Sequence, residues 1–278
     1  MSQRRKLRQR LRQLADIRDI MDAMKNLAQV EIFKLKPRLE NQQQMVLDLE
    51  RMAEDFLSYH PYSFPDNDGE VDIWVLFGSE RGFCGDFNEA LLEHLDHCLP
   101  YSTSNQTFFM PIGGKLIRRF TDKPDKTRAI DGLDVAEEVP LMLNHIVNGI
   151  GQLQSQFNAV NVHAVFHHAD TGQLTCKQLL PPFEHLRKQP SRQGTTPLLH
   201  IPPADFFSIL VDEYLYYALH EIAYLSLLSE NNKRIQHMTG ALQRLDEKTG
   251  ELTRQYHLHR QEEITEELEV ILLNTTIV

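Results

Sequence analysis

Helix-breaking residues are missing from both ends of this 278-residue chain. Glycine is absent before Gly69, and twelve of the thirteen prolines lie between Pro61 and Pro203. After Pro203 there is no further proline, and the only glycines are Gly240 and Gly250. Because proline costs a helix interior about 3 kcal/mol and glycine about 1 kcal/mol, both ends are predicted to be long helices around a turn-rich middle.

Long apolar runs and paired cysteines are also missing. No stretch approaches the ~18–20 apolar residues that a membrane span needs. The basic N-terminus, MSQRRKLRQRLRQ, is followed by no apolar segment, which argues against a secretory signal. The three cysteines, Cys84, Cys98 and Cys176, show no C-x-x-C spacing. The sequence therefore predicts free thiols in a reducing compartment and no disulfide framework.

Negative charge dominates the chain except near its start. The formal net charge is −10, yet residues 1–38 hold eleven Lys and Arg against four Asp and Glu, about +7, which leaves about −17 for the rest. A basic arm on an acidic body can bind nucleic acid, anionic lipid or an acidic protein surface, or it can be an ordinary solvated helix face.

The two ends have the apolar periodicity of partner helices. One face of the first is predicted from a three- or four-residue repeat: Leu7, Leu11, Leu14, Ile17, Ile20, Met24, Leu27 and Val30. Met21, Met24 and Leu27 are interpreted as coiled-coil core, and Pro37 is expected to kink this helix or to start a new one. The proline-free segment after Pro203 would span ~105 Å as one helix. We therefore predict an antiparallel coiled coil between the two ends.

Strand and helix patterns alternate between these ends. VDIWVLF, QTFFMPI, VNVHAVF and LTCKQLL are typical of strands, whereas NEALLEHLDHCL, GGKLIRRF and VAEEVPLMLNHIVNGIGQLQSQF are typical of helices. This alternation predicts a mainly parallel sheet. The expected fold class is α/β with a coiled coil, in which a Rossmann-like body at 70–202 is flanked by coiled-coil helices at 1–58 and 204–278.

A glycine-rich turn, LFGSERGFCGDFN, follows the first predicted strand and precedes a helix, which is the order found in phosphate-binding loops. The spacing of Gly78, Gly82 and Gly85 matches neither the dinucleotide fingerprint nor the P-loop. No Lys-Ser/Thr pair follows, and the acidic Glu80 and Asp86 would repel a phosphate. The glycines are therefore predicted to permit a tight turn with close backbone approach.

Two histidine groups have the spacing of metal ligands. They are HLDH at His94–His97 and HHAD at His167–Asp170. Nothing nearby supplies a third ligand and a general base, so these histidines are expected to lie on the surface.

The same glycine-rich loop resembles the T-D-R-G-L-C-G-G-L-N segment of the gamma subunit of F-type ATP synthases, with Glu80, Phe83 and Asp86 as departures. Further along, SENNKRIQHM and RQEEITEELEVI are similar to the family's S-E, R-M-x-x-M and R-Q-x-x-I-T-x-E-L-x-E-I blocks, at matching spacing. Near the start, Ala23, Met24 and Ala28 are in register with the family's first helix. The resemblance covers both termini and the first strand.

The resemblance implies a central rotor stalk that catalyses nothing and binds no cofactor. Its partners would be the alpha and beta subunits, the epsilon subunit and the c-subunit ring, without nucleic acid or a membrane span. It would lie peripherally at the cytoplasmic face of the bacterial inner membrane. The subunit contacts carried over from the family are Met24, Arg81, Cys84, Arg234, Arg260, Gln261 and Thr265.

Several of these contacts have alternatives. Arg81 would contact the acidic lever of the beta subunit, or it would pair with Glu80 or Asp86 within the turn. Glu262 and Glu263 replace small residues next to the family's contact with acidic loops of beta, so they point away or the partner has changed. The apolar end, VILLNTTIV, is expected inside the alpha–beta ring.

Two other classes of function remain open from the residues alone. One is a nucleotide-binding α/β enzyme with coiled-coil arms, which tight nucleotide binding would favour. The other is a basic coiled-coil protein that binds nucleic acid or acts as a scaffold, which steeply salt-dependent DNA binding would favour.

Overall fold

The computed structural model describes residues 3–60, 70–99, 106–120, 126–157, 159–169, 172–186 and 198–275. The chain forms two compact units, one from Met1–Gln29 and Ile235–Val278 and the other from Val30–Arg234. Among the described residues, no helix has an apolar stretch long enough to cross a bilayer.

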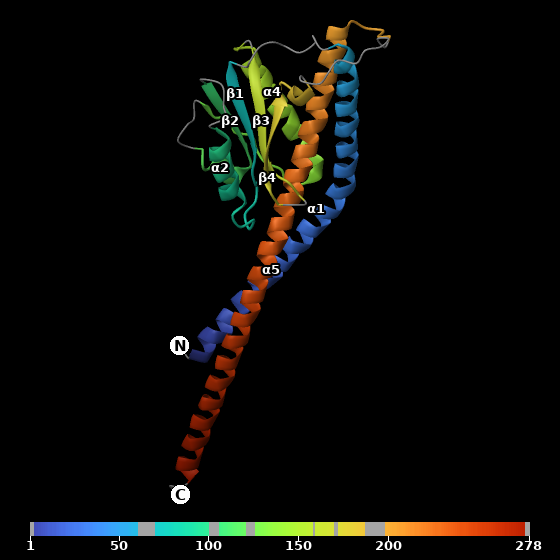
Figure 1. The fold of residues 1–278 in the computed structure, drawn as a ribbon. Coiled ribbons are helices and arrows are strands. Elements are labelled where there is room, and N and C mark those ends of the chain that lie inside the picture. Colours follow the sequence, from blue (N-terminus) through green and yellow to red (C-terminus); the bar gives the residue numbers. More distant parts are fainter. Residues whose placement is uncertain are drawn as a thin grey trace. The chain divides into compact units, whose positions relative to one another are not determined.

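The second unit contains a four-stranded sheet with the strand order β2-β1-β3-β4 (Figure 1). The strands are β1 (Val71–Phe77), β2 (Gln106–Ile112), β3 (Val160–His167) and β4 (Leu174–Leu180). β1 pairs in parallel with β2 and β3, and β4 pairs antiparallel with β3. The mainly parallel sheet predicted from the alternating patterns is thus confirmed.

Helices cover the two faces of this sheet. Its helical segments are α2 (Phe87–Cys98), α3 (Gly114–Ile117), η4 (Ala136–Glu138), α4 (Val139–Gln154) and η5 (Glu184–Leu186). Successive strand residues point to opposite faces: Trp74 and Leu76 pack with Leu91 of α2, whereas Ile73 packs in the cluster that contains Ile146 of α4. The sheet therefore has a hydrophobic core on each side.

Two long helices supply the remaining layer of the second unit: α1 (Gln3–Tyr59) and α5 (Pro203–Thr275). Within this unit they run antiparallel, because the ring of Phe56 lies 4.8 Å from that of Phe206 and the Tyr214 hydroxyl lies 3.5 Å from Glu50. α1 continues through Pro37 as one helix, so no new helix begins there.

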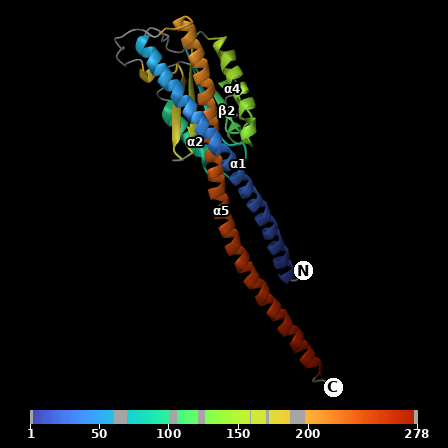
Figure 2. The ribbon, with the colours of Figure 1, turned by 90° about the vertical axis from the view of Figure 1, so that its right-hand side faces the viewer.

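The first unit is an antiparallel helix pair (Figure 2). Arg4 of α1 lies 3.0 Å from Glu263 of α5, and Arg18 lies 2.8 Å from Asp246. Beyond the second of these ion pairs, three residues after Arg18, Met21 packs with Met238 and Leu242. The predicted antiparallel coiled coil is confirmed here, and past Glu263 α5 runs on beyond the described start of α1.

The predicted core face of α1 is partly wrong. Ile17, Ile20, Leu27 and Val30 are 45%, 60%, 60% and 52% exposed. The buried positions instead recur every seven residues: Leu7, Met21, Ala28 and Leu35, with the half-buried Leu14 between the first two. The residues of a coiled-coil seam are selected by a repeat of 3.5 residues and not by the size of each apolar side chain. Ala28 therefore lies in the seam and Leu27 does not.

Candidate functional site

The glycine-rich loop joins β1 to α2, and its three glycines have different roles. A Cβ on Gly78 would lie 2.6 Å from the Leu116 Cβ, so close packing requires glycine there. Gly85 has a φ of 63°, which a side chain disfavours. A Cβ on Gly82 would lie 3.7 Å from the nearest side-chain atom, which belongs to Lys115. This position therefore has room for a methyl group.

Glu80, in the glycine-rich loop, reaches backbone N–H groups that belong to two other segments of the chain. Its carboxylate accepts hydrogen bonds from the backbone N–H groups of Gly114, at 2.7 Å, and Gly132, at 2.9 Å. Backbone N–H groups that converge on one point form an anion site. Here the anion is the chain's own side chain, so the Glu80 carboxylate ties the glycine-rich loop to the segments that contain Gly114 and Gly132.

Arg81 is held by an acid that the sequence did not indicate. Its Nε lies 2.6 Å from Asp134 Oδ1, and its second guanidinium nitrogen lies 2.6 Å from Oδ2. The expected pairing with Glu80 or Asp86 is therefore wrong, because Glu80 caps two backbone groups and Asp86 pairs with Lys233 at 3.3 Å. The hydrogen bond to Asp134 raises the pKa of Arg81 above its usual range.

A buried polar cluster joins the loop to α5. Glu230, Arg234 and Cys84 are 4%, 7% and 5% exposed. Arg234 forms an ion pair with Glu230 and donates to the Gly82 carbonyl at 3.4 Å and to the Cys84 sulfur at 3.4 Å. A further nitrogen donates to Asn231 Oδ1 at 2.8 Å. The guanidinium donors are thus used inside the chain.

Burial changes the protonation of this cluster. It raises the pKa of the Cys84 thiol to about 12, with Glu230 adding to the shift and Arg234 opposing it. It also raises the pKa of Glu230 to about 7, against the attraction of Arg234. A thiol with such a pKa stays protonated at neutral pH, which makes Cys84 a structural group rather than a nucleophile.

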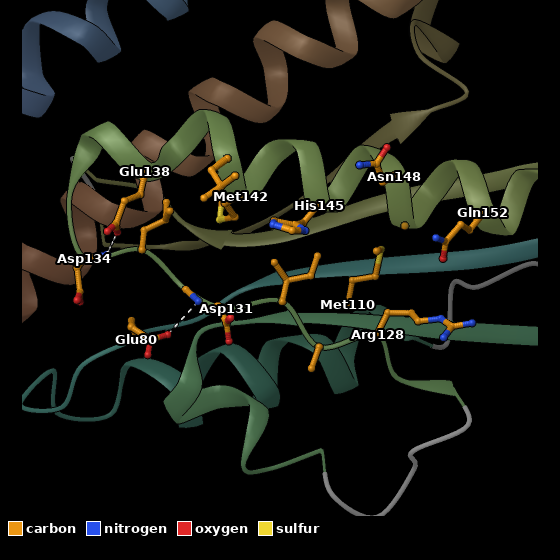
Figure 3. A pocket seen from close by; sticks show the side chains of 16 residues that line it. Glu80, Met110, Arg128, Asp131, Asp134, Glu138, Met142, His145, Asn148 and Gln152 are labelled. Carbon is orange, nitrogen blue, oxygen red and sulfur yellow. Dashed lines mark hydrogen bonds between the residues drawn. The ribbon is translucent and has the colours of Figure 1, made fainter.

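A groove of about 550 Å³ lies between α4 and the segment that contains Asp131 and Asp134 (Figure 3). Glu80 and Glu138 also line it, and Arg128 is a basic residue in its wall. Glu138 accepts a hydrogen bond from the Asp134 backbone N–H at 2.9 Å. A wall with four carboxylates disfavours phosphate groups, so this groove does not restore a nucleotide site.

The predicted contacts of the first unit differ in exposure. Met24 is half-buried and packs against the Met21, Met238 and Leu242 cluster. Arg260, Gln261 and Thr265 are exposed, and the Thr265 hydroxyl donates to the Gln261 carbonyl at 2.9 Å. The contacts of these side chains with a partner stay predictions.

The two glutamates next to Arg260 are paired within the same unit. Glu263 lies 3.0 Å from the Arg4 guanidinium, and Glu262 lies 2.9 Å from the His259 ring. The Glu263 charge is thus balanced by α1.

Within the described residues the two histidine groups lie outside any metal-binding arrangement. No group of three or more His, Cys, Asp and Glu side chains in the described part of the chain is arranged to hold a metal ion. His167 is buried rather than on the surface as expected, because its ring stacks on Phe87 at 3.9 Å and its Nε2 lies 2.8 Å from the Phe87 carbonyl. Asp170 lies outside the described residues.

Comparison with known proteins identifies the family. A family model described as ATP synthase matches residues 3–273. The ATP synthase gamma chain of Halothermothrix orenii is 23% identical over 288 residues, which cover 96% of each chain. That of Fusobacterium nucleatum is 23% identical over 211 residues, which cover 71% of this chain and 70% of that protein. The chain belongs to the gamma-subunit family of ATP synthase.

Solved structures show the same fold for this gamma-family chain. A chain of the Euglena gracilis mitochondrial ATP synthase, in a structure of OSCP, F1 and c-ring, matches with a TM-score of 0.60 at 18% identity and covers 98% of this chain and 93% of that one. A chain from the central stalk and c-ring of the Tetrahymena thermophila enzyme matches with a TM-score of 0.55 at 18% identity, over 80% and 99% of the two chains. The predicted fold class is confirmed.

Sequence reasoning missed the residues that hold the loop of this gamma-family chain. Asp134 and Glu230 lie 53 and 146 residues from their partners Arg81 and Cys84. The one available signal was the spacing of Glu230 and Arg234, which are four residues apart and therefore adjacent on a helix face.

Proposed function

We propose that this chain is the non-catalytic central rotor stalk of an F-type ATP synthase, coupling ion flow through the c-subunit ring to ATP synthesis or hydrolysis. Its partners are the alpha and beta subunits, the epsilon subunit and the c-ring, and it works peripherally at the cytoplasmic face of the bacterial inner membrane. The observation that carries the proposal is the family match over residues 3–273.

Mechanical coupling requires stiff elements, and the helices supply them. α1 has 57 residues and α5 has 73, each without a break. Where the sheet meets them, Lys177 of β4 lies 3.9 Å from Glu50 of α1 and 3.8 Å from Glu221 of α5. The ammonium also lies 5.6 Å from the Tyr214 ring centre. These contacts favour a body that turns together with its helices.

The predicted contact residues differ in burial. Arg260, Gln261 and Thr265 are exposed. The donors of Arg260 and Gln261 are suited to carboxylates and carbonyls on the beta subunit, whereas the Thr265 hydroxyl, which donates to the Gln261 carbonyl, can accept a hydrogen bond there. The burial of Cys84 and Arg234 instead favours a role in holding the glycine-rich loop. Met24 acts through coil packing.

The functional division that accompanies this proposal is a coiled-coil helix at 1–58, a body at 70–202 and a second coiled-coil helix at 204–278. In it the segments of the two helices that form the first unit enter the ring, and the body remains outside together with the helix segments that pack on it.

Co-purification tests the proposal. A tagged chain expressed with the alpha, beta and epsilon subunits of its own organism should purify with three copies each of alpha and beta, and the complex should hydrolyse ATP. The tagged chain alone should show no ATPase activity. Purification of the chain free of alpha and beta, or ATP hydrolysis by the chain alone, would contradict a non-catalytic rotor.

A further inference from the structure

Two of the three free cysteines meet on one face of the sheet. Cys98 is the last residue of α2 and packs against the hydrophobic cluster that contains Leu95 and Val165. Cys176 lies on β4, directly opposite Val165 of β3. Residues that are opposite each other in an antiparallel pair share a face of the sheet. Cys176 therefore projects toward the cluster against which Cys98 packs.

The neighbours of Cys176 on β4 give the same orientation independently. Leu174, two residues earlier, packs against the same cluster as Cys98. Lys177, the next residue, reaches Glu50 and Glu221 of the long helices on the other face. Because successive strand residues alternate between faces, Cys176 lies on the α2 side. The two thiols share a hydrogen bond there, so their sulfurs are adjacent while both are reduced.

This pair differs from Cys84 in its access to solvent. The Cys84 thiol is buried and held against Glu230 and Arg234, whereas Cys98 is half-buried and Cys176 is exposed. Among the residues that the structure describes, no third His, Cys, Asp or Glu completes a metal site at the pair. A small oxidant in solution can therefore reach this pair far more easily than it reaches Cys84.

We propose that Cys98 and Cys176 form a redox modification site, at which a small-molecule disulfide converts the two thiols into a reversible disulfide bond between α2 and β4. The sequence does not indicate this pair, because the two cysteines lie on elements that only the folded sheet brings together. The proposal concerns the second unit alone and does not rest on the proposed rotor function.

The reaction is a thiol–disulfide exchange in two steps. Desolvation of its sulfur, together with the adjacent Cys98, raises the pKa of Cys176 to about 12. Cys176 thus keeps its proton at neutral pH and donates it to Cys98, which favours Cys98 as the thiolate that attacks first. That attack breaks the small disulfide, forms a mixed disulfide on Cys98 and releases one thiolate, which takes up the Cys98 proton.

The second step closes the bond within the chain. Cys176 attacks the Cys98 sulfur, and the second thiolate leaves with the Cys176 proton. In total the two protein thiols are oxidised and the small disulfide is reduced to two thiols. The new bond joins the end of α2 to an edge strand across a long loop that contains α4 and β3. Closing a loop of this length should raise the melting temperature by about 5 °C or more.

Oxidation of the full chain by glutathione disulfide tests the proposal. The chain is incubated at a series of ratios of glutathione to glutathione disulfide, quenched with acid and alkylated, and its intact mass is measured. The reduced chain should carry three alkyl groups and the oxidised chain one, which peptide mapping should place on Cys84. The melting temperature should rise on oxidation and return to its starting value after dithiothreitol.

Cys98→Ser and Cys176→Ser are the matched controls. Each should lose both the disulfide bond and the rise in melting temperature. Cys176→Ser should accumulate a mixed disulfide with glutathione on Cys98, and it should do so several times faster than Cys98→Ser accumulates one on Cys176. The order of these two rates follows from the proton that Cys176 retains.

Three results would overturn the proposal. The bond between Cys98 and Cys176 could fail to form even with about a hundredfold excess of glutathione disulfide. Cys84 could enter disulfides as readily as the other two cysteines, which would mean that the fold does not select the pair. The rise in melting temperature could persist in Cys98→Ser. A chain that forms the bond but does not bind alpha and beta subunits would contradict the rotor function and leave this proposal standing.

Discussion

Removing the Glu230 carboxylate should release the glycine-rich loop from α5. The Glu230 and Arg234 side chains are only 5% and 8% exposed, so Glu230→Ala leaves the Arg234 charge buried and unpaired. Breaking a buried ion pair in this way costs about 3–5 kcal/mol. Because about 1.4 kcal/mol corresponds to a factor of ten, the loop should open at least about a hundredfold more often.

The labelling rate of Cys84 measures how often the loop opens, because its thiol is buried against Glu230 and Arg234. In a background with Cys98→Ser and Cys176→Ser, the rate at which a maleimide labels Cys84 should rise at least about a hundredfold in Glu230→Ala. Loss of Glu230 also lowers the thiol pKa, because the carboxylate raises it in the wild type. Measuring the rate across pH separates this effect from opening.

Glu251→Ala is the matched control. Glu251 also lies on α5 and pairs with Lys248 at 3.1 Å, but both side chains are about 60% exposed, 58% and 62%. Exposed pairs contribute about 0–1 kcal/mol, so this change should leave the labelling rate within a few-fold of wild type. A Glu230→Ala rate equally close to wild type would refute the assignment of this cluster as the support of the loop.

Glu230, Gly78 and Arg260 each give a further testable outcome. Burial raises the folded-state pKa of Glu230 to about 7 from its ordinary 4.5. The contribution of Glu230 to the free energy of unfolding is therefore full below about pH 4.5 and is lost as pH rises through 7. Urea unfolding should show this loss in the wild type and not in Glu230→Gln. Gly78→Ala should lower the free energy of unfolding by about 1–3 kcal/mol through its clash with Leu116, whereas Gly82→Ala should change it by less than about 0.5 kcal/mol. Arg260→Ala should lower ATPase turnover of the assembled complex about tenfold, as expected for loss of a charge-assisted hydrogen bond, while circular dichroism of the isolated chain stays unchanged.

The fold could be predicted because its signals are local. The runs VDIWVLF and QTFFMPI coincide with β1 and β2, since strands buried on both faces need continuous apolar sequence. The long helices follow from the positions of proline and glycine. Pro37 shows the limit of that rule, because α1 is long and packed enough to continue through it.

The seam of α1 could not be read from hydrophobicity alone. Leu27 and Ala28 are neighbours, and the smaller one is buried while the larger one is 60% exposed. Which side of a helix faces its partner is decided by the register of the pair, for example Met21 opposite Met238 and Leu242. The register depends on the residues of the other helix as well. The apolar pattern of one helix therefore shows that the helix is amphipathic but does not show which residues face the partner.

The supports of the loop were out of reach for a different reason. Arg81 and Asp134 are joined only when the segment after β2 folds back beside the sheet, where Thr127 and Ile130 bridge to it. From the sequence, Glu80 is only an obstacle to phosphate binding. The structure gives it a positive role, because its carboxylate satisfies the backbone N–H groups of Gly114 and Gly132.

A double-mutant cycle on Arg4 and Glu263 tests whether the negative charge of Glu263 affects the proposed contact of Arg260 with the beta subunit. Their ion pair is 3.0 Å long and its side chains are 41% and 36% exposed, so it contributes little to folding. Its consequence lies in the assembly: it neutralises a carboxylate three residues from Arg260. Arg4→Ala would remove this ion pair, so that the carboxylate repels an acidic partner loop more strongly, and turnover of the complex should fall about fivefold, which corresponds to about 1 kcal/mol. Glu263→Ala should be near wild type, and the double mutant should recover most of the loss. If the double mutant is as slow as Arg4→Ala alone, Arg4 acts on the partner directly and Glu263 has no part in the contact.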